Sequence, residues 1–156
     1  MPLLAFCNNR IVVSKRALML YVVNENNDTI FQRLIACGEN LGNKTRIGDR
    51  KTPEGDFKIK MMYDATSWKH DFSDGQGLPL GAYGPLFCRL NVPGFNDIGI
   101  HGTIFPESIG TRSSEGCVRL RNEDIKALYP HCRNGMKVII EPDDVDHVIP
   151  AEKNGG

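Results

Sequence analysis

Short apolar runs alternate with clusters of turn-forming residues in the first part of the chain. Residues 10–16 and 17–25 are rich in β-branched and apolar side chains, which favour strands. The polar cluster at residues 24–28 predicts a turn, and the strand pattern resumes over residues 29–38. We therefore expect the chain to open with a β-meander.

Four later segments carry the same signal. Residues 56–63 alternate apolar and polar positions, and we expect Phe57, Ile59 and Met61 to lie on the buried face of a strand. The other three are the apolar segments at residues 85–92, 97–102 and 135–142. Together with the opening meander, these segments predict a mainly β domain.

One segment, residues 122–132, has the periodicity of a helix. We expect Asn122 to cap this helix, and the acidic residues Glu123 and Asp124 favour the positive end of the helix dipole. The side chains on its apolar face are Ile125, Leu128, Tyr129 and Cys132. Pro130 lacks the amide hydrogen that a helix interior needs, so the helix should kink or end there.

Two glycine-rich segments show no periodicity. Residues 39–55 end in the sequence TPEG, which suits a type I turn. Residues 64–84 are too rich in glycine for a regular element, and long irregular segments inside a compact domain are commonly functional. We therefore expect residues 64–84 to lie near an active site.

Length and composition favour one globular domain. The 156 residues include 40% hydrophobic and 24% charged side chains, which are ordinary values for a folded domain. The 19 basic residues balance the 19 acidic residues, so net charge gives no attraction to nucleic acid. No apolar run approaches the ~20 residues of a membrane-spanning helix. We assign residues 1–9 to an N-terminal extension, 10–142 to the domain and 143–156 to a polar C-terminal tail.

The chain has five cysteines, an odd number that leaves at least one thiol unpaired even in an oxidising compartment. Cys117 is our candidate for the free thiol. We interpret the other four as small buried apolar residues, and any disulfide pairing among them stays open: Cys7, Cys37, Cys88 and Cys132. No cysteine and histidine cluster has the spacing of a zinc site, so we expect neither a metal nor a cofactor.

Cys117 lies sixteen residues after His101, and a glycine adjoins each of them. A thiol must lose its proton to act as a nucleophile, and an imidazole beside it can accept that proton. The carbonyl of Gly102 could bind the other ring nitrogen of His101 and fix its tautomer. Gly116 permits close approach of a substrate, and the N–H groups of Gly116 and Cys117 could stabilise an oxyanion. Arg119 would project to the same side of an extended segment as Cys117 and could bind a substrate carboxylate.

The chain resembles the L,D-transpeptidases, the YkuD-like domain family, in four segments toward its C-terminal end: IHGT, SIG, SSEGCVRLRNEDIKALY and GMKVII. Further upstream it is similar to the family segment ahead of the active site, in ACGENLGNKTRIGDRKTPEGDFKI. The resemblance covers roughly residues 10–142, so that this range is identified as an L,D-transpeptidase catalytic domain. The combination of His-Gly with Ser-x-Gly-Cys-x-Arg is specific to the family.

This resemblance implies a curved sheet or β-sandwich with one main helix after the cysteine. It also implies attack on the carbonyl of the third residue of a peptidoglycan stem tetrapeptide, release of the terminal D-alanine and transfer of the acyl group to an amine. Cys117 would be the nucleophile, His101 the base and then the acid, and Gly102 the residue that orients the histidine. The residues that support the cleft would be Ser114, Gly116 and Arg119.

The implied partners are peptidoglycan stem peptides and an amine acceptor, either a second stem peptide or a protein lysine. Water as the acceptor would make the protein an L,D-carboxypeptidase, and loss of turnover would leave a peptidoglycan-binding module. A sortase-like transpeptidase uses the same residue types, but its cysteine usually follows threonine rather than glycine. We expect a monomer in the bacterial cell envelope, periplasmic or otherwise extracytoplasmic, although no complete secretory signal is visible in the chain.

Glu115 stands where the family most often has a histidine. Its carboxylate lies two residues before the Cys117 sulfur, where it would disfavour the thiolate and raise the thiol pKa. The alternative is that Glu115 points away from the sulfur and is neutralised by Arg112 or Arg121. The sequence leaves both interpretations open.

Overall fold

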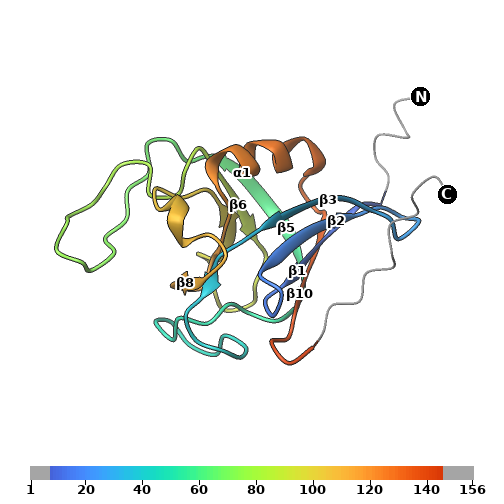
Figure 1. Ribbon diagram of the computed structural model, residues 1–156, viewed down its shortest axis with the longest axis horizontal. Coiled ribbons are helices and arrows are strands. Elements are labelled where there is room, and N and C mark those ends of the chain that lie inside the picture. Colours follow the sequence, from blue (N-terminus) through green and yellow to red (C-terminus); the bar gives the residue numbers. More distant parts are fainter. Residues whose placement is uncertain (1–7, 146–156) are drawn as a thin grey trace.

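A single curved sheet of eight strands dominates the computed structural model, which describes residues 8–145 (Figure 1). Its strands in spatial order are β3 (Thr29–Leu34), β2 (Met19–Val23), β1 (Arg10–Ser14), β10 (Lys137–Glu141), β5 (Gly55–Asp64), β6 (Leu86–Leu90), β7 (Gly99–His101) and β9 (Val118–Arg119). A second, two-stranded sheet pairs β4 (Cys37–Gly38) with β8 (Arg112–Ser114). The mainly β fold class is confirmed. Most of the N-terminal extension and of the C-terminal tail, with Cys7, lies outside the described residues.

Most strand predictions are confirmed to within two residues at each end. The exception is the predicted strand at residues 29–38, which is interrupted between β3 and β4. At this point the Ile35 N–H donates to the Leu18 carbonyl, and Ala36 bridges to Arg119. The chain therefore leaves its pairing with β2 and continues as β4 in the second sheet. Strands β8 and β9, of three and two residues, were not predicted because a pattern of period two needs a longer run.

The alternation in β5 changes phase in the middle of the strand. Ile59 is buried as predicted, and Phe57 is half-buried, but the Met61 side chain is 44% exposed. The pairing with β6 shifts register between Ile59 and Met61, so the strand contains a bulge. A bulge adds one residue and moves the following side chains to the opposite face, which makes Met62 the residue that packs on the core.

A parallel crossover brings the two candidate motifs together. Strand β7 runs parallel to β9, with Ile100 opposite Val118 and His101 opposite Arg119. The residues between them leave the sheet through the 3₁₀ turn η2 (Pro106–Ser108) and return through β8. The pairing therefore places the end of the histidine motif beside the residues that follow Cys117.

Helix α1 (Asn122–Leu128) packs over the curved sheet, at the top of Figure 1. The predicted cap is wrong: Arg121 is the N-cap residue and makes no side-chain cap bond, while Asn122 is the first helical residue. The Asn122 side-chain oxygen instead accepts the Thr103 N–H at 2.9 Å. The α-helix ends before Pro130, as predicted, and continues as the 3₁₀ turn η3 (Tyr129–His131).

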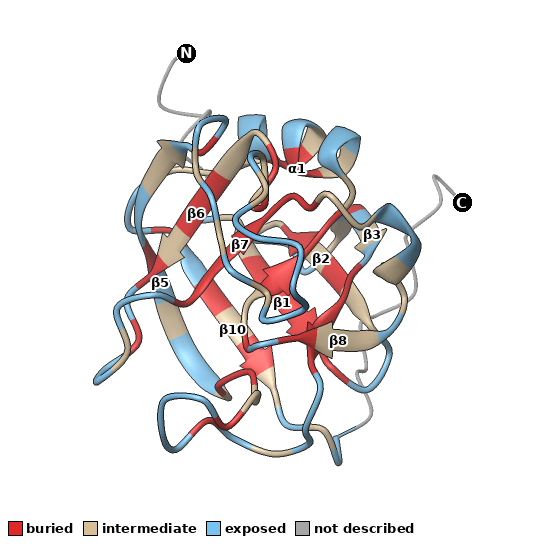
Figure 2. Cartoon of the chain, turned by 90° about the vertical axis from the view of Figure 1, so that its left-hand side faces the viewer, coloured by how far each residue is buried: buried red, intermediate tan, exposed pale blue. Residues whose placement is uncertain are grey.

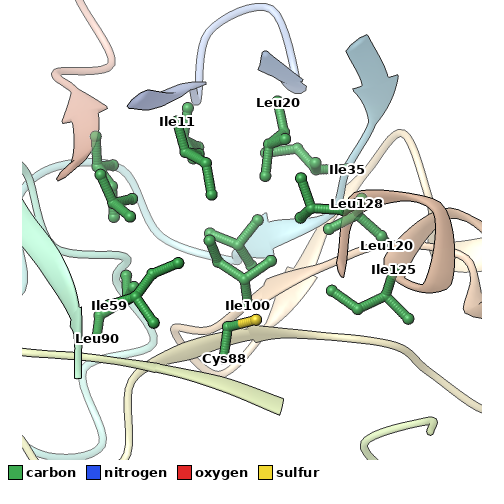
Figure 3. Close-up of a cluster of buried hydrophobic side chains, with 14 of the residues drawn as sticks. Ile11, Leu20, Ile35, Ile59, Cys88, Leu90, Ile100, Leu120, Ile125 and Leu128 are labelled. Carbon is green, nitrogen blue, oxygen red and sulfur yellow. The ribbon is translucent and has the colours of Figure 1, made fainter. Parts of the chain in front are cut away.

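The hydrophobic core fills the space between the curved sheet and α1. Figure 2 shows buried residues along β1 and β6, and Figure 3 shows Ile11, Ile100 and Leu128 pointing into one shared interior. Cys37 and Cys88 are buried in this core as predicted, whereas Cys132 is half-buried. Within residues 8–145 all the cysteines are free thiols.

Candidate active site

Cys117 lies in a tight turn between β8 and β9 that the Ser114 side chain closes. The Ser114 hydroxyl donates to the Cys117 carbonyl at 2.6 Å and accepts the Gly116 N–H at 3.1 Å. Gly116 has a φ of 143°, which disfavours residues with a Cβ. Because its N–H is bound to Ser114, Gly116 does not present the free oxyanion donor that the sequence suggested.

His101 is buried at the end of β7 between two aromatic rings. The Phe87 ring stacks on it at 5.4 Å between centroids, and the Tyr83 ring meets it edge-on at 4.9 Å. Its Nδ1 lies 2.5 Å from the Gly102 carbonyl oxygen. A carbonyl only accepts hydrogen bonds, so this contact requires the proton on Nδ1 and leaves Nε2 as the basic nitrogen.

The environment keeps His101 uncharged. Burial lowers the pKa of His101 to about 3; the Gly102 hydrogen bond opposes this shift, and the charges of Arg119 and His70 add to it. The imidazole is therefore neutral at physiological pH and able to accept a proton.

The three residues that the sequence singled out lie around one cavity. His101 and Arg119 are paired across parallel strands, so their side chains lie on the same face of the sheet, and Cys117 lies two residues before Arg119. All three line a cavity of about 270 Å³. Its other lining residues include Lys44, Arg50, His70, Phe72, Tyr83, Asp97, Ser114 and Glu115.

The Cys117 thiol is protonated in this arrangement. It donates a hydrogen bond to the Asp97 backbone carbonyl at 3.3 Å rather than to His101. Burial raises the pKa of the Cys117 thiol to about 11, and the Asp97 carboxylate adds to this rise, while the Gly99 N–H, Arg119 and Lys44 oppose it. The cavity therefore holds a neutral thiol and a neutral imidazole, not an ion pair.

Two buried cations lie on the cavity wall. Arg119 is 7% exposed, and its guanidinium lies over the Phe72 ring at 5.7 Å; burial lowers the pKa of Arg119 without discharging it. Lys44 pairs with Asp49 at 3.0 Å inside the loop of residues 39–55. The loop itself is held by Asp49, whose carboxylate accepts the N–H groups of Thr45, Arg46 and Lys51.

Glu115 pairs with His70, a partner that the sequence did not reveal. Its Oε2 lies 2.7 Å from His70 Nε2, and His70 Nδ1 lies 3.0 Å from the Tyr83 hydroxyl. Arg112, one of the two expected partners, instead contacts Asp143. His70 and Tyr83 belong to residues 64–84, the segment at the left of Figure 1, so its predicted place near the site is confirmed.

Sequence reasoning missed several residues of this cavity. Lys44, His70, Tyr83 and Asp97 carry no motif, and only the unusual length of the loop of residues 64–84 pointed to two of them. Within residues 8–145 no three histidine, cysteine, aspartate or glutamate side chains gather as a metal site would require. No helix in the same range is long and apolar enough to cross a membrane.

Known proteins share this sequence pattern and fold. A family model described as the L,D-transpeptidase catalytic domain matches residues 8–140. The protein named "Probable L,D-transpeptidase YbiS" from Escherichia coli (strain K12) is 31% identical over 139 residues, covering 82% of this chain and 43% of the relative.

Solved structures give the same picture of the fold. Bd1075 of Bdellovibrio bacteriovorus superimposes with a TM-score of 0.65 and 26% identity, over 94% of this chain and 52% of that one. An L,D-transpeptidase from Mycobacterium smegmatis superimposes with a TM-score of 0.66 and 15% identity, over 86% of this chain and 59% of that one. The chain thus spans less than two thirds of each of these three relatives.

Proposed function

The chain belongs to the L,D-transpeptidase catalytic domain family, and from this we propose that it is a cysteine-dependent transpeptidase acting on bacterial peptidoglycan stem peptides. The observation that carries the proposal is the gathering of Cys117, His101 and Arg119 around one cavity in the matched region. The relatives named L,D-transpeptidases support the same reaction class.

In the proposed first step, the Cys117 sulfur attacks the carbonyl carbon of the donor peptide. His101 Nε2 accepts the thiol proton as the carbon–sulfur bond forms, and the carbonyl π electrons move to the oxygen. Collapse of this oxyanion breaks the carbon–nitrogen bond, and the proton on Nε2 passes to the departing amine, the terminal D-alanine. During both proton transfers the Gly102 carbonyl keeps the imidazole oriented, because it accepts a hydrogen bond from His101 Nδ1.

In the second step an acceptor attacks the thioester. An amine of a second stem peptide or of a protein lysine gives a new amide, and His101 takes the amine proton and returns it to the sulfur. Water in the same place would give a carboxypeptidase product. Because the substrate belongs to the cell wall, we propose an extracytoplasmic location for the protein.

Incubation with purified muropeptides, with products identified by mass spectrometry, tests this function. We expect cross-linked products or loss of D-alanine from the wild type. Cys117→Ala should lose several orders of magnitude in rate, since a methyl group cannot act as the nucleophile. Cys132→Ala, at a half-buried thiol outside the cavity lining, is the matched control and should retain activity. Substantial turnover by Cys117→Ala would exclude the mechanism.

We propose that Arg119 binds a carboxylate of the donor peptide, since it is a buried cation facing the cavity of the thiol. Arg119→Lys should lower kcat/KM about tenfold or more, because a point charge does not replace the planar pair of donors. The test compares kcat/KM for a donor peptide with a free carboxylate and for the same peptide with that carboxylate amidated. The wild type should prefer the free acid and the variant should lose that preference; equal preference in both proteins would rule out this role.

A further inference from the structure

Most polar backbone groups around Cys117 already have partners within the protein. The Gly116 N–H and the Cys117 carbonyl are both bound to the Ser114 hydroxyl. The Gly116 carbonyl accepts a hydrogen bond from the Thr52 hydroxyl at 2.7 Å. Among residues 8–145 no backbone acceptor is found for the Cys117 N–H. Backbone donors away from water are nearly always paired, so an unpaired N–H beside the thiol is a donor available to a substrate.

Thr52 is fixed from several sides. Its side chain is 1% exposed, and its hydroxyl accepts the Gly38 N–H at 2.9 Å while it donates to Gly116. The buried Lys15 ammonium binds the Thr52 carbonyl at 2.8 Å. Gly38 also approaches Thr52 closely, because a Cβ at this glycine would lie 2.9 Å from the Thr52 nitrogen. The Thr52 hydroxyl is therefore held in place, with its proton directed at the Gly116 carbonyl.

This contact fixes the direction of a peptide plane. No peptide bond in residues 8–145 is cis, so the Gly116 carbonyl and the Cys117 N–H point in opposite directions from the same plane. Thr52 draws the carbonyl into the protein interior, which turns the N–H away from Thr52. We propose that Thr52 is a positioning residue that aims the Cys117 N–H at the oxyanion formed during acyl transfer.

This inference deepens the proposed function and rests on it. When the Cys117 sulfur bonds to a carbonyl carbon, negative charge moves to the carbonyl oxygen, and a donor already in place stabilises that charge without reorganising. An amide plane that is free to tilt would present the same N–H at a poorer angle. Thr52 is not among the residues that line the cavity of the thiol, so its effect should appear only in reactions that form an oxyanion.

Two reagents separate this role from a general structural one. p-Nitrophenyl acetate acylates a thiol through a tetrahedral oxyanion and releases p-nitrophenolate, whereas iodoacetamide alkylates the sulfur by displacement of iodide and forms none. In Thr52→Val, which has nearly the same shape but no hydroxyl, we expect acylation of Cys117 to fall about 10- to 100-fold. The alkylation rate measured at the same pH should stay within about twofold of the wild type.

Thr52→Ser retains the hydroxyl and should retain both rates. Thr111→Val is the matched control, since Thr111 is exposed and its hydroxyl binds only within its own turn, to Ser108 and Ser113; it should change neither rate. If Thr52→Val does not fold, Thr52→Ala replaces it with the same expectation. Equal changes in acylation and alkylation, no loss of acylation, or loss of acylation in Thr52→Ser would each overturn the proposal.

The same reagents keep the two proposals distinguishable. Both act on the thiol without recognition of peptidoglycan. A wild-type protein that reacts with p-nitrophenyl acetate but leaves muropeptides unchanged would refute the proposed function, while the comparison of Thr52 variants would still decide the role of Thr52.

Discussion

Cys117 and His101 are a neutral thiol and a neutral imidazole, and the proton lies on the sulfur rather than on the ring as in a thiolate–imidazolium pair. Burial disfavours the charged form of both groups, raising the pKa of the thiol to about 11 and lowering the pKa of the imidazole to about 3. The thiol also donates to the Asp97 carbonyl, so it must change partner before His101 accepts its proton. We infer that proton transfer accompanies substrate binding and attack rather than preceding them.

Alkylation of Cys117 by iodoacetamide should therefore follow a strongly alkaline titration. Because only the thiolate reacts and the thiol pKa is raised to about 11, the rate should rise about tenfold per pH unit from pH 7 to 10 without levelling off. A plateau below pH 8 would contradict the neutral thiol.

Variants at two carboxylates identify the charge that acts on the sulfur. Asp97→Asn should shift the alkylation profile of Cys117 to lower pH, since the Asp97 carboxylate contributes to the raised thiol pKa. Glu115→Gln should leave the profile close to that of the wild type, because Glu115 pairs with His70. The opposite order of effects would restore Glu115 as the charge that acts on the sulfur.

At the scale of elements, two irregular loops supply walls of the cavity, strands β7 and β9 supply His101 and Arg119, and the turn between β8 and β9 supplies Cys117. Residues 39–55 contribute Lys44, and residues 64–84 contribute His70 and Tyr83. The Glu115–His70 contact ties residues 64–84 to the turn that carries Cys117. Loops have few buried contacts, so one such tie can decide how firmly this wall is held.

We expect His70→Ala to loosen residues 64–84. Because Glu115 and His70 are partly exposed, the effect should be modest: about two- to fivefold faster amide hydrogen exchange in this loop, read by mass spectrometry. Glu115→Gln should act in the same direction. Glu107→Gln, at an exposed carboxylate in η2, is the control and should leave the loop unchanged. Unaltered hydrogen exchange in both His70→Ala and Glu115→Gln would show that the Glu115–His70 contact does not hold the loop.

At the scale of the whole molecule, one buried lysine joins distant parts of the chain. The Lys15 side chain is 1% exposed, and its ammonium binds the carbonyls of Gly42 and Thr52 and the carboxylates of Glu54 and Asp143. Strand β1, the loop of residues 39–55 and the first residue of the predicted polar tail meet at this point. The start of that tail is thus anchored rather than loosely held.

Lys15→Met should lower the free energy of unfolding by about 3–5 kcal/mol at pH 7, because it leaves the Glu54 carboxylate without its cation and Asp143 with Arg112 alone. Burial opposes ionisation of Asp143, but the Gly42 N–H, Arg112 and Lys15 outweigh it and lower the Asp143 pKa. A lowered folded-state pKa gives stability that is present above the unfolded pKa of about 4 and lost as pH falls through the folded value. The gap between wild type and variant should therefore shrink below about pH 4.

Urea denaturation at several pH values measures this gap. Lys60→Met, at an exposed position on β5, is the control and should change stability by less than about 0.5 kcal/mol. A Lys15→Met variant as stable as the wild type, or a gap that grows on acidification, would contradict the role of the network.

The sequence by itself determined most strands of the main sheet and singled out the candidate reactive residues. Runs of β-branched and apolar residues favour strands, so they placed nearly every strand of the main sheet. The pair of His101 and Cys117 could be named because each sits in a short, specific motif. Both kinds of signal are local, and they fail where an element is as short as β9 or where a bulge changes the phase, as at Met61.

Only the tertiary structure decided which distant residues meet. The Thr52–Gly116 bond spans 64 residues and the His70–Glu115 contact spans 45, and neither partner carries a local signal for the other. Their meeting depends on the strand register and on the crossover between β7 and β9. The pKa values of Cys117 and His101 were likewise undetermined by sequence, because burial and neighbouring charge in the folded chain set them.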